Sequence, residues 1–289
     1  MSSSRWSRNG RGLLSLHVAL FFVFLYLPIA MLVVYSFNAN DVSMMTWTGF
    51  TFDWYVRVFE NLGLLSPDDT QIAAGNAQLY SDPNLAPAVI NSLIVGFVSS
   101  TIATVIGTLT AIGLDRAVFP GKEVYRGLVM LPIIIPDIVL GIALLVFLSS
   151  VGLPLGRGSV IAAHTLFLTS YVTVIVGARL AGMDRSLDEA SADLGARPAV
   201  TFRRVTLPLL APSIAGGFLL SLVISFDDLV IAFFTTGVGA TTLPIYLFSA
   251  IKRNVSPEIN AVSVLIVAMS MLCVVVALIL RRDSRGASL

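Results

Sequence analysis

Six segments of this chain are apolar over about 20 residues or more, the length that a helix needs to cross the hydrocarbon core of a bilayer. They are residues 13–37, 88–114, 125–150, 160–181, 207–235 and 259–280. The chain is 56% apolar and 12% charged, with a mean hydropathy of +0.88, whereas soluble domains carry about 25% charged residues. The sequence therefore predicts an all-α integral membrane protein with six transmembrane helices.

The 18 Lys and Arg residues are distributed unequally around these segments. With the N-terminus in the cytoplasm, 14 of them lie on the cytoplasmic side and four lie outside, namely Arg57, Arg157, Lys252 and Arg253. Because positive residues are enriched in cytoplasmic loops, we expect both termini to be cytoplasmic. The predicted parts are a tail (1–12), a membrane domain (13–280) with an outer loop (38–87) and a cytoplasmic loop (182–206), and a second tail (281–289).

The predicted outer loop contains six acidic residues, a single basic residue, Arg57, and the aromatic-rich stretch WTGFTFDWYVRVFE. Two interpretations stay open for it. The loop can dock a soluble partner outside the membrane, or it can place a short amphipathic helix on the membrane surface.

A polar segment, SLDEASADLGARPAVTFRRVTLPLL (186–210), lies between two apolar segments. Ser186 and Glu189 fit a capping box, which predicts that a short helix begins there. Gly195 ends this helix because glycine tolerates positive φ, and Pro198 marks the start of a second short helix. The spacing i, i+3, i+4, i+7 predicts one narrow face of mostly small residues, formed by Leu187, Ala190, Ser191 and Leu194. The segment therefore predicts a helix, turn, helix elbow that another protein can approach closely.

The spacing within this elbow resembles the EAA loop of permeases from binding-protein-dependent ABC importers, where Glu-Ala-Ala, Gly and Ile-x-Leu-Pro recur. Two residues depart conservatively from that pattern, Ser191 from Ala and Val205 from Ile. Three further stretches occur in the order seen in spermidine/putrescine importers: MLPIIIPDIVLGIALL, SFDDLVIAFFTTG and TTLPIYLFSAIKRNVSPEINA. The resemblance covers roughly residues 91–275.

This resemblance implies a type I ABC importer permease fold in the bacterial inner membrane. It implies that the elbow is a coupling helix seated on a separate ATPase, through Glu189, Ala190, Ser191, Leu194, Gly195, Val205, Leu207 and Pro208. The implied partners are a dimer of ATPase subunits that uses ATP and Mg, a second, related permease subunit and an extracytoplasmic polyamine-binding protein. The implied cargo is putrescine, spermidine or a similar small cation.

The chain lacks a phosphate-binding loop of its own, because Gly121-Lys122 is followed by Glu123 and not by Ser or Thr. We therefore expect this chain to bind no cofactor and to carry no enzymatic activity, with ATP hydrolysed by a separate polypeptide. The net charge of +1 does not indicate nucleic-acid binding.

Three carboxylates, those of Asp137, Asp227 and Asp228, fall within predicted spans, where each costs roughly 2.5–3.5 kcal/mol at the bilayer centre. Asp228 continues a stripe of small residues, whereas Asp227 points about 100° away from it. That stripe consists of Ser213, Gly217, Ser221 and Ser225. We predict that at least one of the three acids, with Asp228 favoured, faces a wet path and attracts a cationic solute, and that Phe226 and Tyr246 are available for cation–π contact. Alternatively, the acids hydrogen-bond to neighbouring helices or pair with a companion chain and do not meet the solute.

Other interpretations account for less of the sequence. His17 and His164 lie on different predicted spans without a ligand cluster, so we expect packing or hydrogen bonding and no metal site. An intramembrane aspartyl protease needs two carboxylates that share a proton, but the glycine-framed aspartate motif of that class is absent. A stand-alone secondary carrier or channel for a small cation fits the composition, but it lacks a detectable inverted repeat and leaves the elbow unexplained.

Overall fold

The structure is a computed structural model that describes residues 8–40, 46–65, 83–184, 186–253 and 257–286. Within these residues the regular elements are helices, apart from an isolated antiparallel bridge between Asn38 and Phe50. The prediction of an all-α chain is therefore confirmed. The chain divides into two compact units, Met1–Ser81 with Ala250–Ala268 (unit 1) and Asp82–Ser249 with Met269–Leu289 (unit 2).

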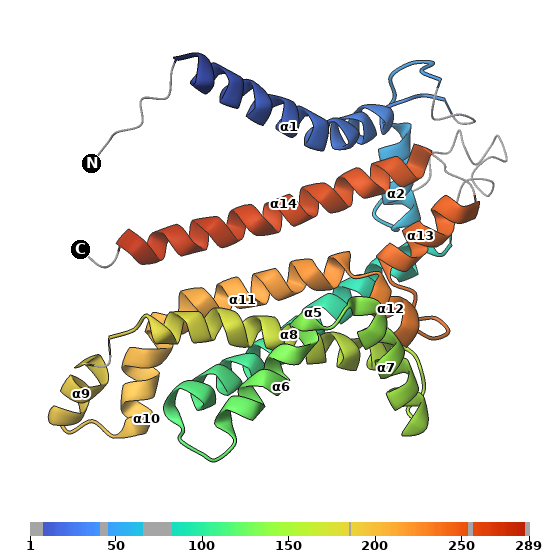
Figure 1. The fold of residues 1–289 in the computed structure, drawn as a ribbon. Helices are drawn as coiled ribbons and strands as arrows, with labels where there is room; N and C mark the ends of the chain where they lie inside the picture. Colours follow the sequence, from blue (N-terminus) through green and yellow to red (C-terminus); the bar gives the residue numbers. More distant parts are fainter. Residues whose placement is uncertain (1–7, 41–45, 66–82, 185, 254–256, 287–289) are drawn as a thin grey trace. The chain divides into compact units, whose positions relative to one another are not determined.

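Unit 2 holds most of the membrane helices and the predicted elbow (Figure 1). Its elements are α5 (Leu85–Arg116), α6 (Lys122–Ile134), α7 (Asp137–Ser150), α8 (Arg157–Ala181), α9 (Ser186–Asp193), α10 (Pro198–Thr201), the π-helical turn η1 (Phe202–Thr206), α11 (Leu207–Asp227) and α12 (Val230–Thr235). Two further helices run across the boundary between the units, α13 (Leu243–Arg253) and α14 (Pro257–Gly286).

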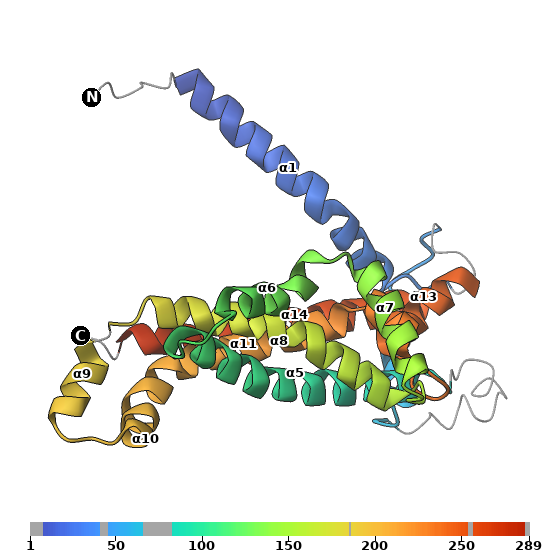
Figure 2. The same cartoon turned by 60° about the horizontal axis from the view of Figure 1, so that its bottom comes forward.

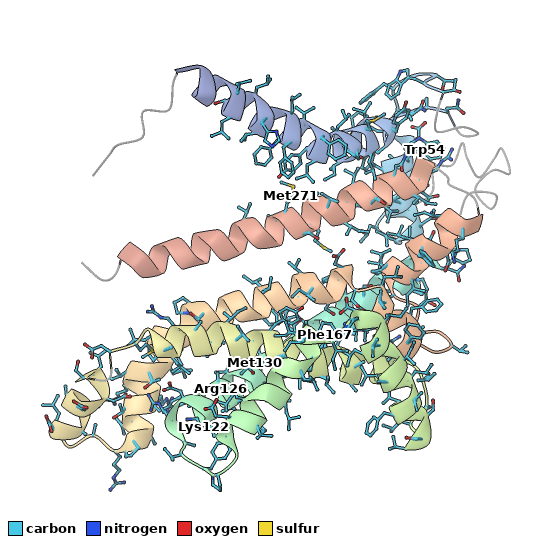
Figure 3. All side chains as sticks on the ribbon, in the orientation of Figure 1. Trp54, Lys122, Arg126, Met130, Phe167 and Met271 are labelled. Atoms are coloured by element: carbon cyan, nitrogen blue, oxygen red, sulfur yellow. The ribbon has the colours of Figure 1, made fainter. Side chains whose placement is uncertain are left out.

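The core of unit 2 lies where α5, α8 and α11 pack together. A Cβ atom built on Gly107 of α5 would lie 2.7 Å from Val172 Cβ and 2.8 Å from the Thr169 carbonyl oxygen on α8. Only a residue without a side chain permits this approach, as is usual where helices pack in membranes. Phe167 of α8, labelled in Figure 3, belongs to an apolar cluster that also contains Ile231 of α12.

Four helical stretches in the described part of the chain are long and apolar enough to cross a membrane: Gly12–Tyr35, Leu85–Arg116, Arg157–Ala181 and Pro198–Asp227. The pair α6 and α7, bent by 109°, makes a fifth if it is counted as one span. Glu258–Leu272 is a shorter apolar helix. The multi-pass character is confirmed, whereas the count of six and the side of the two termini stay predictions.

Two predicted spans are not continuous helices. In 125–150 the helix stops at Ile134, because a proline at 136 lacks an N–H group and holds Ile135 in extended backbone, with ψ 134°. In 207–235 the helix stops at Asp227, and Asp228 is extended, with φ −70° and ψ 117°. The expectation of unbroken helices was wrong at these two points. Asp137 follows the first break directly, whereas Asp228 lies in the second break and so does not continue the helical stripe predicted for it.

Unit 1 contains α1 (Arg8–Tyr35) and α2 (Asp53–Asn61). Trp54 on α2, labelled in Figure 3, is buried, and its Nε1–H donates to the Asn38 carbonyl over 2.7 Å. The Asn61 side chain donates to Glu258 Oε1 at the start of α14 over 2.7 Å. The outer loop contains a short helix, α2, which is the element that one of its two interpretations requires. Its contact with a partner or with the membrane surface stays a prediction, and residues 66–82 of the loop lie outside the described residues.

Candidate functional site

The predicted elbow forms one end of unit 2 (Figures 1 and 2). Its first helix, α9, ends where Gly195 adopts φ +76°. The Gly195 N–H donates to the Ala192 carbonyl over 2.8 Å, and the Ala196 N–H donates to the Ser191 carbonyl over 3.1 Å. These two bonds form a Schellman motif, which satisfies carbonyls left free at the helix end. The turn expected at Gly195 is confirmed.

The start of α9 differs in detail from the capping box predicted around Ser186. The helix begins at Ser186 itself, and the Ser186 N–H donates to Oδ1 of Asp184 over 2.9 Å. The hydrogen bonds from the Ser186 backbone and side chain lower the pKa of the Asp184 carboxyl below its ordinary value, because they favour the ionised form. Asp184 therefore provides the side-chain acceptor at the beginning of the elbow.

The second half of the elbow runs without interruption into α11. Arg197 is extended, with φ −70° and ψ 149°, and Pro198 occupies the first turn of α10. The π-helical turn η1 connects α10 to α11, so the expected second helix is confirmed. The hydroxyl groups of Ser191 and Thr201 lie 2.8 Å apart and join the two halves. The remaining motif residues differ in exposure: Val205 is half-buried, and Leu207 and Pro208 are exposed.

No residue of α9 is buried, and its predicted face is largely open to solvent. Leu187, Glu189 and Ala190 are exposed, and Ser191 is half-buried beside Thr201. Leu194, at the turn, is 88% exposed. A leucine held this far into solvent leaves apolar area uncovered at a cost of roughly 25 cal/mol per Å². The elbow therefore has a small, partly apolar surface suited to close contact with another protein.

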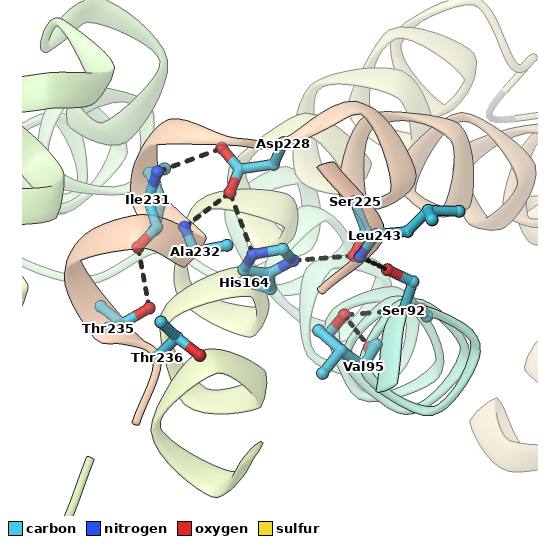
Figure 4. Close-up of polar contacts among 12 residues, drawn as sticks. Ser92, Val95, His164, Ser225, Asp228, Ile231, Ala232, Thr235, Thr236 and Leu243 are labelled. Atoms are coloured by element: carbon cyan, nitrogen blue, oxygen red, sulfur yellow. Dashed lines mark hydrogen bonds and ion pairs between the residues drawn. The ribbon is translucent and has the colours of Figure 1, made fainter. Parts of the chain in front are cut away.

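The carboxylate of Asp228 lies in a buried polar cluster between α8 and the break after α11 (Figure 4). Its Oδ1 accepts the Ile231 N–H over 3.3 Å, and its Oδ2 accepts the Ala232 N–H over 2.7 Å. His164 Nε2 lies 3.2 Å from the same Oδ2 at an ion-pair distance, without the alignment of a hydrogen bond. His164 Nδ1 lies 2.7 Å from Ser225 Oγ. Asp228 therefore caps α12 and contacts α8 at the same time.

The other two predicted acids are placed differently. Asp227 is the last residue of α11 and is exposed, so it differs from Asp228 in burial. Asp137 is exposed in the first turn of α7, where its charge complements the helix dipole. Phe226 lies against Gly96 on α5, and Tyr246 is buried on α13. Whether any of these residues meets a solute stays a prediction.

A polar contact between α5 and the connection from α12 to α13 was not predicted from the sequence. The buried Asn91 side chain donates to the carbonyls of Gly239 and Thr241, each over 3.0 Å, and accepts the Arg157 Nε–H over 2.9 Å. Ser92 Oγ accepts the Leu243 N–H over 2.8 Å. The only signal in the sequence was the presence of polar residues early in an apolar span.

No role was predicted from the sequence for Arg116, one of the 14 basic residues assigned to the cytoplasmic side. Its Nη2 lies 2.9 Å from Asp188 Oδ2 on α9 and donates to Thr206 Oγ1 over 3.0 Å. Arg116 is the last residue of α5, so this contact joins a membrane helix to the elbow. A basic residue at the end of a span gave no indication of its partner 72 residues later.

Comparisons with known proteins agree with this architecture. The family model described as "binding-protein-dependent transport system inner membrane component" matches residues 103–282. Over 263 residues the chain is 38% identical to the spermidine/putrescine transport system permease protein PotC of Haemophilus influenzae, covering 91% of this chain and 94% of that protein. It is 37% identical over 252 residues to the putrescine transport system permease protein PotI of Escherichia coli K12, with 85% and 82% covered.

Solved structures show the same fold. A chain of a bacterial alginate ABC transporter, crystallised with an alginate pentasaccharide-bound periplasmic protein, aligns with a TM-score of 0.66 at 16% identity, with 96% of this chain and 94% of that chain covered. A chain of the inward-facing MetNI methionine ABC transporter aligns with a TM-score of 0.55 at 26% identity, with 69% and 95% covered.

Proposed function

This chain belongs to the family of binding-protein-dependent transport system inner membrane components, as a permease subunit of such an importer, and we propose that it transports putrescine or spermidine. The observation that carries the proposal is the 38% identity to a spermidine/putrescine permease over 91% of the chain. Polyamines carry more than one positive charge at neutral pH, and carboxylates at the ends of apolar helices attract such cations. The substrate class therefore agrees with the acids of this chain.

Among the three acids, the geometry favours Asp227 and Asp137 over Asp228 for contact with the solute. Both oxygens of Asp228 already accept backbone N–H groups, and one of them also lies beside His164. The Asp228 side chain is also only 8% exposed, so a solute reaches it less easily than it reaches an exposed carboxylate. Asp227 and Asp137 are exposed. Asp227 directly precedes one helix break, and Asp137 directly follows the other. Phe226 and Tyr246 stay candidates for cation–π contact along the same path.

We also propose the partners of this permease. A dimer of separate ATPase subunits binds ATP with Mg and contacts the elbow through Glu189, Ala190, Ser191, Leu194, Gly195, Val205, Leu207 and Pro208. A second, related permease chain completes the translocation path, and an external polyamine-binding protein delivers the solute. The exposure of Leu194 supports the elbow as the ATPase contact. In this arrangement the chain itself is not an enzyme.

The mechanism follows from these contacts. The loaded binding protein docks on the outer loops, and closure of the ATPase dimer on ATP displaces the elbow. Because α10 and η1 continue directly into α11, a displaced elbow moves α11. Asp227 and Asp228, at the far end of α11, then change their surroundings. The path consequently opens alternately to the two sides of the membrane.

Uptake into proteoliposomes tests the proposal. Proteoliposomes with the complete transporter are expected to accumulate radiolabelled putrescine or spermidine only with internal ATP and external binding protein. Unlabelled polyamine should compete, and an uncharged diol of similar length should not. Proteoliposomes with this chain alone should show no uptake. Uptake by this chain alone would support a stand-alone secondary carrier or channel, the alternative interpretation, and would refute the proposal.

A further inference from the structure

Three side chains from distant parts of the sequence meet where α5 ends beside the elbow. Arg116 Nη2 lies 2.9 Å from Asp188 Oδ2 and 3.0 Å from Thr206 Oγ1, and the Thr206 hydroxyl also lies 3.5 Å from Asp188 Oδ1. Arg116 ends α5, Asp188 lies in α9, and Thr206 is the last residue of η1. The three contacts form a closed triangle, so each side chain is held by the other two.

The triangle matters because α9 has little else to hold it. No residue of α9 is buried, so apolar packing does not hold this helix against the bundle. Among the described residues, the side chains of α9 hydrogen-bond to other elements through Asp188 and through the bond between Ser191 and Thr201. The Ser191 bond leads to α10 and so to α11. The Asp188 contact is different because it reaches α5, which is not adjacent to the elbow in the chain.

Arg116 is suited to this link by chemistry and by position. Its guanidinium group presents several N–H donors in a planar fork and can hold two oxygen atoms at once, which a lysine ammonium does less directionally. It lies in the last turn of α5, where a positive charge complements the helix dipole. Thr206 is fully buried in the π-helical turn, a type of turn often found at functional sites. The surface pair is therefore joined to a buried, geometrically defined residue.

We infer that Arg116 is a positioning residue that makes α5 move with the elbow during the transport cycle. This inference rests on the proposed function, because it assumes that an ATPase displaces α9. The covalent chain passes a displacement of the elbow to α8 and α11, and the triangle passes it to α5. Loss of the triangle removes the direct link between α9 and α5 and leaves only the indirect route through α8 and α11, so the coupling of ATP hydrolysis to solute movement weakens.

A second ion pair in unit 2 gives a matched control. Arg126 Nη1 lies 3.0 Å from Glu123 Oε2, and both residues are in α6. Figure 3 labels Arg126 at the same end of unit 2 as the elbow. The Arg126 pair resembles the Arg116 pair in length and in the exposure of its arginine, although Glu123 is more exposed than Asp188. Unlike the Arg116 pair, it joins residues of one helix. Its removal should therefore leave coupling unchanged.

The test measures solute uptake per ATP hydrolysed in proteoliposomes with the complete transporter. R116Q, D188N and the double variant R116Q/D188N are compared with R126Q. We expect R116Q and D188N each to lower the ratio by about 2- to 30-fold, with ATPase rate, copurification of the ATPase and thermal transition as in the wild type. The double variant should lower uptake per ATP no further than either single variant does. R116K should have a ratio between those of R116Q and the wild type.

Ratios for R116Q and D188N equal to that of R126Q would overturn the inference, as would losses that add in the double variant. If R116Q lowers the thermal transition temperature together with the uptake ratio, T206V decides whether the triangle or the stability of the protein is responsible. This variant removes one corner of the triangle and keeps both charges. A ratio for T206V equal to that of the wild type would then count against the triangle, and a lowered ratio would support it. Failure of the wild-type transporter to require the ATPase would refute the proposed function instead.

Discussion

The buried imidazole of His164 on α8 lies 3.2 Å from the carboxylate of Asp228, which follows the end of α11 and caps α12. His164 is fully buried, and the Asp228 side chain is 8% exposed. One acidic side chain therefore joins three helices at the point where a predicted span is broken. This contact leads to a distinction between Asp228 and its neighbour Asp227 that experiments can test.

Asp228→Ala should destabilise the protein, because it removes the acceptor of the Ile231 and Ala232 N–H groups in a buried site. The cost should be about 1–3 kcal/mol, the usual penalty for a buried group left unsatisfied. Thermal unfolding in detergent measures it, with Asp227→Ala at the adjacent exposed position as the control. Equal unfolding temperatures for the two variants would show that the cap does not stabilise the fold.

Asp227→Asn should weaken uptake and leave stability unchanged. If the exposed Asp227 carboxylate attracts a polyamine, loss of its charge raises the apparent KM of the complete transporter for putrescine or spermidine. An exposed charge contact contributes on the order of 1 kcal/mol or less, so we expect about a fivefold effect at most. Uptake titrations with the wild type and with Asp227→Glu, which keeps the charge, provide the comparison. Wild-type kinetics in Asp227→Asn would exclude Asp227 from the path.

Gly195→Val should uncouple ATP hydrolysis from uptake. Gly195 has φ +76°, where a residue with a Cβ costs roughly 1–2 kcal/mol, and a β-branched residue is particularly unfavourable. No atom lies within 4 Å of a Cβ built there, so the effect comes from the backbone and not from a clash. Gly195→Asn is the control, because Asn tolerates this conformation. Uptake per ATP should fall in the Val variant and stay closer to wild type in the Asn variant, and the reverse order contradicts the turn's role.

Gly107→Ala should destabilise the packing of α5 against α8. The added Cβ would lie 2.7 Å from Val172 Cβ and 2.8 Å from the backbone oxygen of Thr169, so the helices have to move apart. Overpacking of this kind costs about 1–3 kcal/mol. Gly113→Ala, in the same helix with no atom within 4 Å of the added Cβ, serves as the control. Similar unfolding temperatures for the two variants would contradict the close approach.

The Asp184 cap should make the start of α9 insensitive to pH near neutrality. Hydrogen bonds from Ser186 lower the folded pKa of Asp184 below 3.8. Its stabilising contribution is therefore present above the unfolded pKa and is lost only as the pH falls through the lower folded value. Hydrogen exchange at the Ser186 N–H should show a constant protection factor between about pH 5 and pH 8.

Asp184→Ala should remove this protection, because the Ser186 N–H loses its acceptor. Asp184→Asn should keep most of it, because the amide oxygen can accept the same hydrogen bond. Equal protection in the Ala variant and the wild type would assign the cap to another group.

The sequence determined the elements that depend on neighbouring residues. The apolar segments, the turn at Gly195 and the second elbow helix after Pro198 follow from periodicity and from the backbone preferences of glycine and proline, which act within a few residues. The same backbone preferences, applied to Pro136, account for the break between α6 and α7, which hydropathy alone does not indicate.

The tertiary structure alone decided which side chains meet across the bundle. His164 and Asp228 are 64 positions apart, and Arg116 and Asp188 are 72 positions apart. A hydropathy pattern assigns a residue to a span or a loop but does not specify its partner, because the partner depends on how whole helices pack. At Asp228 the cap on α12 is itself local, because the carboxylate accepts N–H groups three and four residues later, but its meeting with His164 depends on how α8 and α12 pack together.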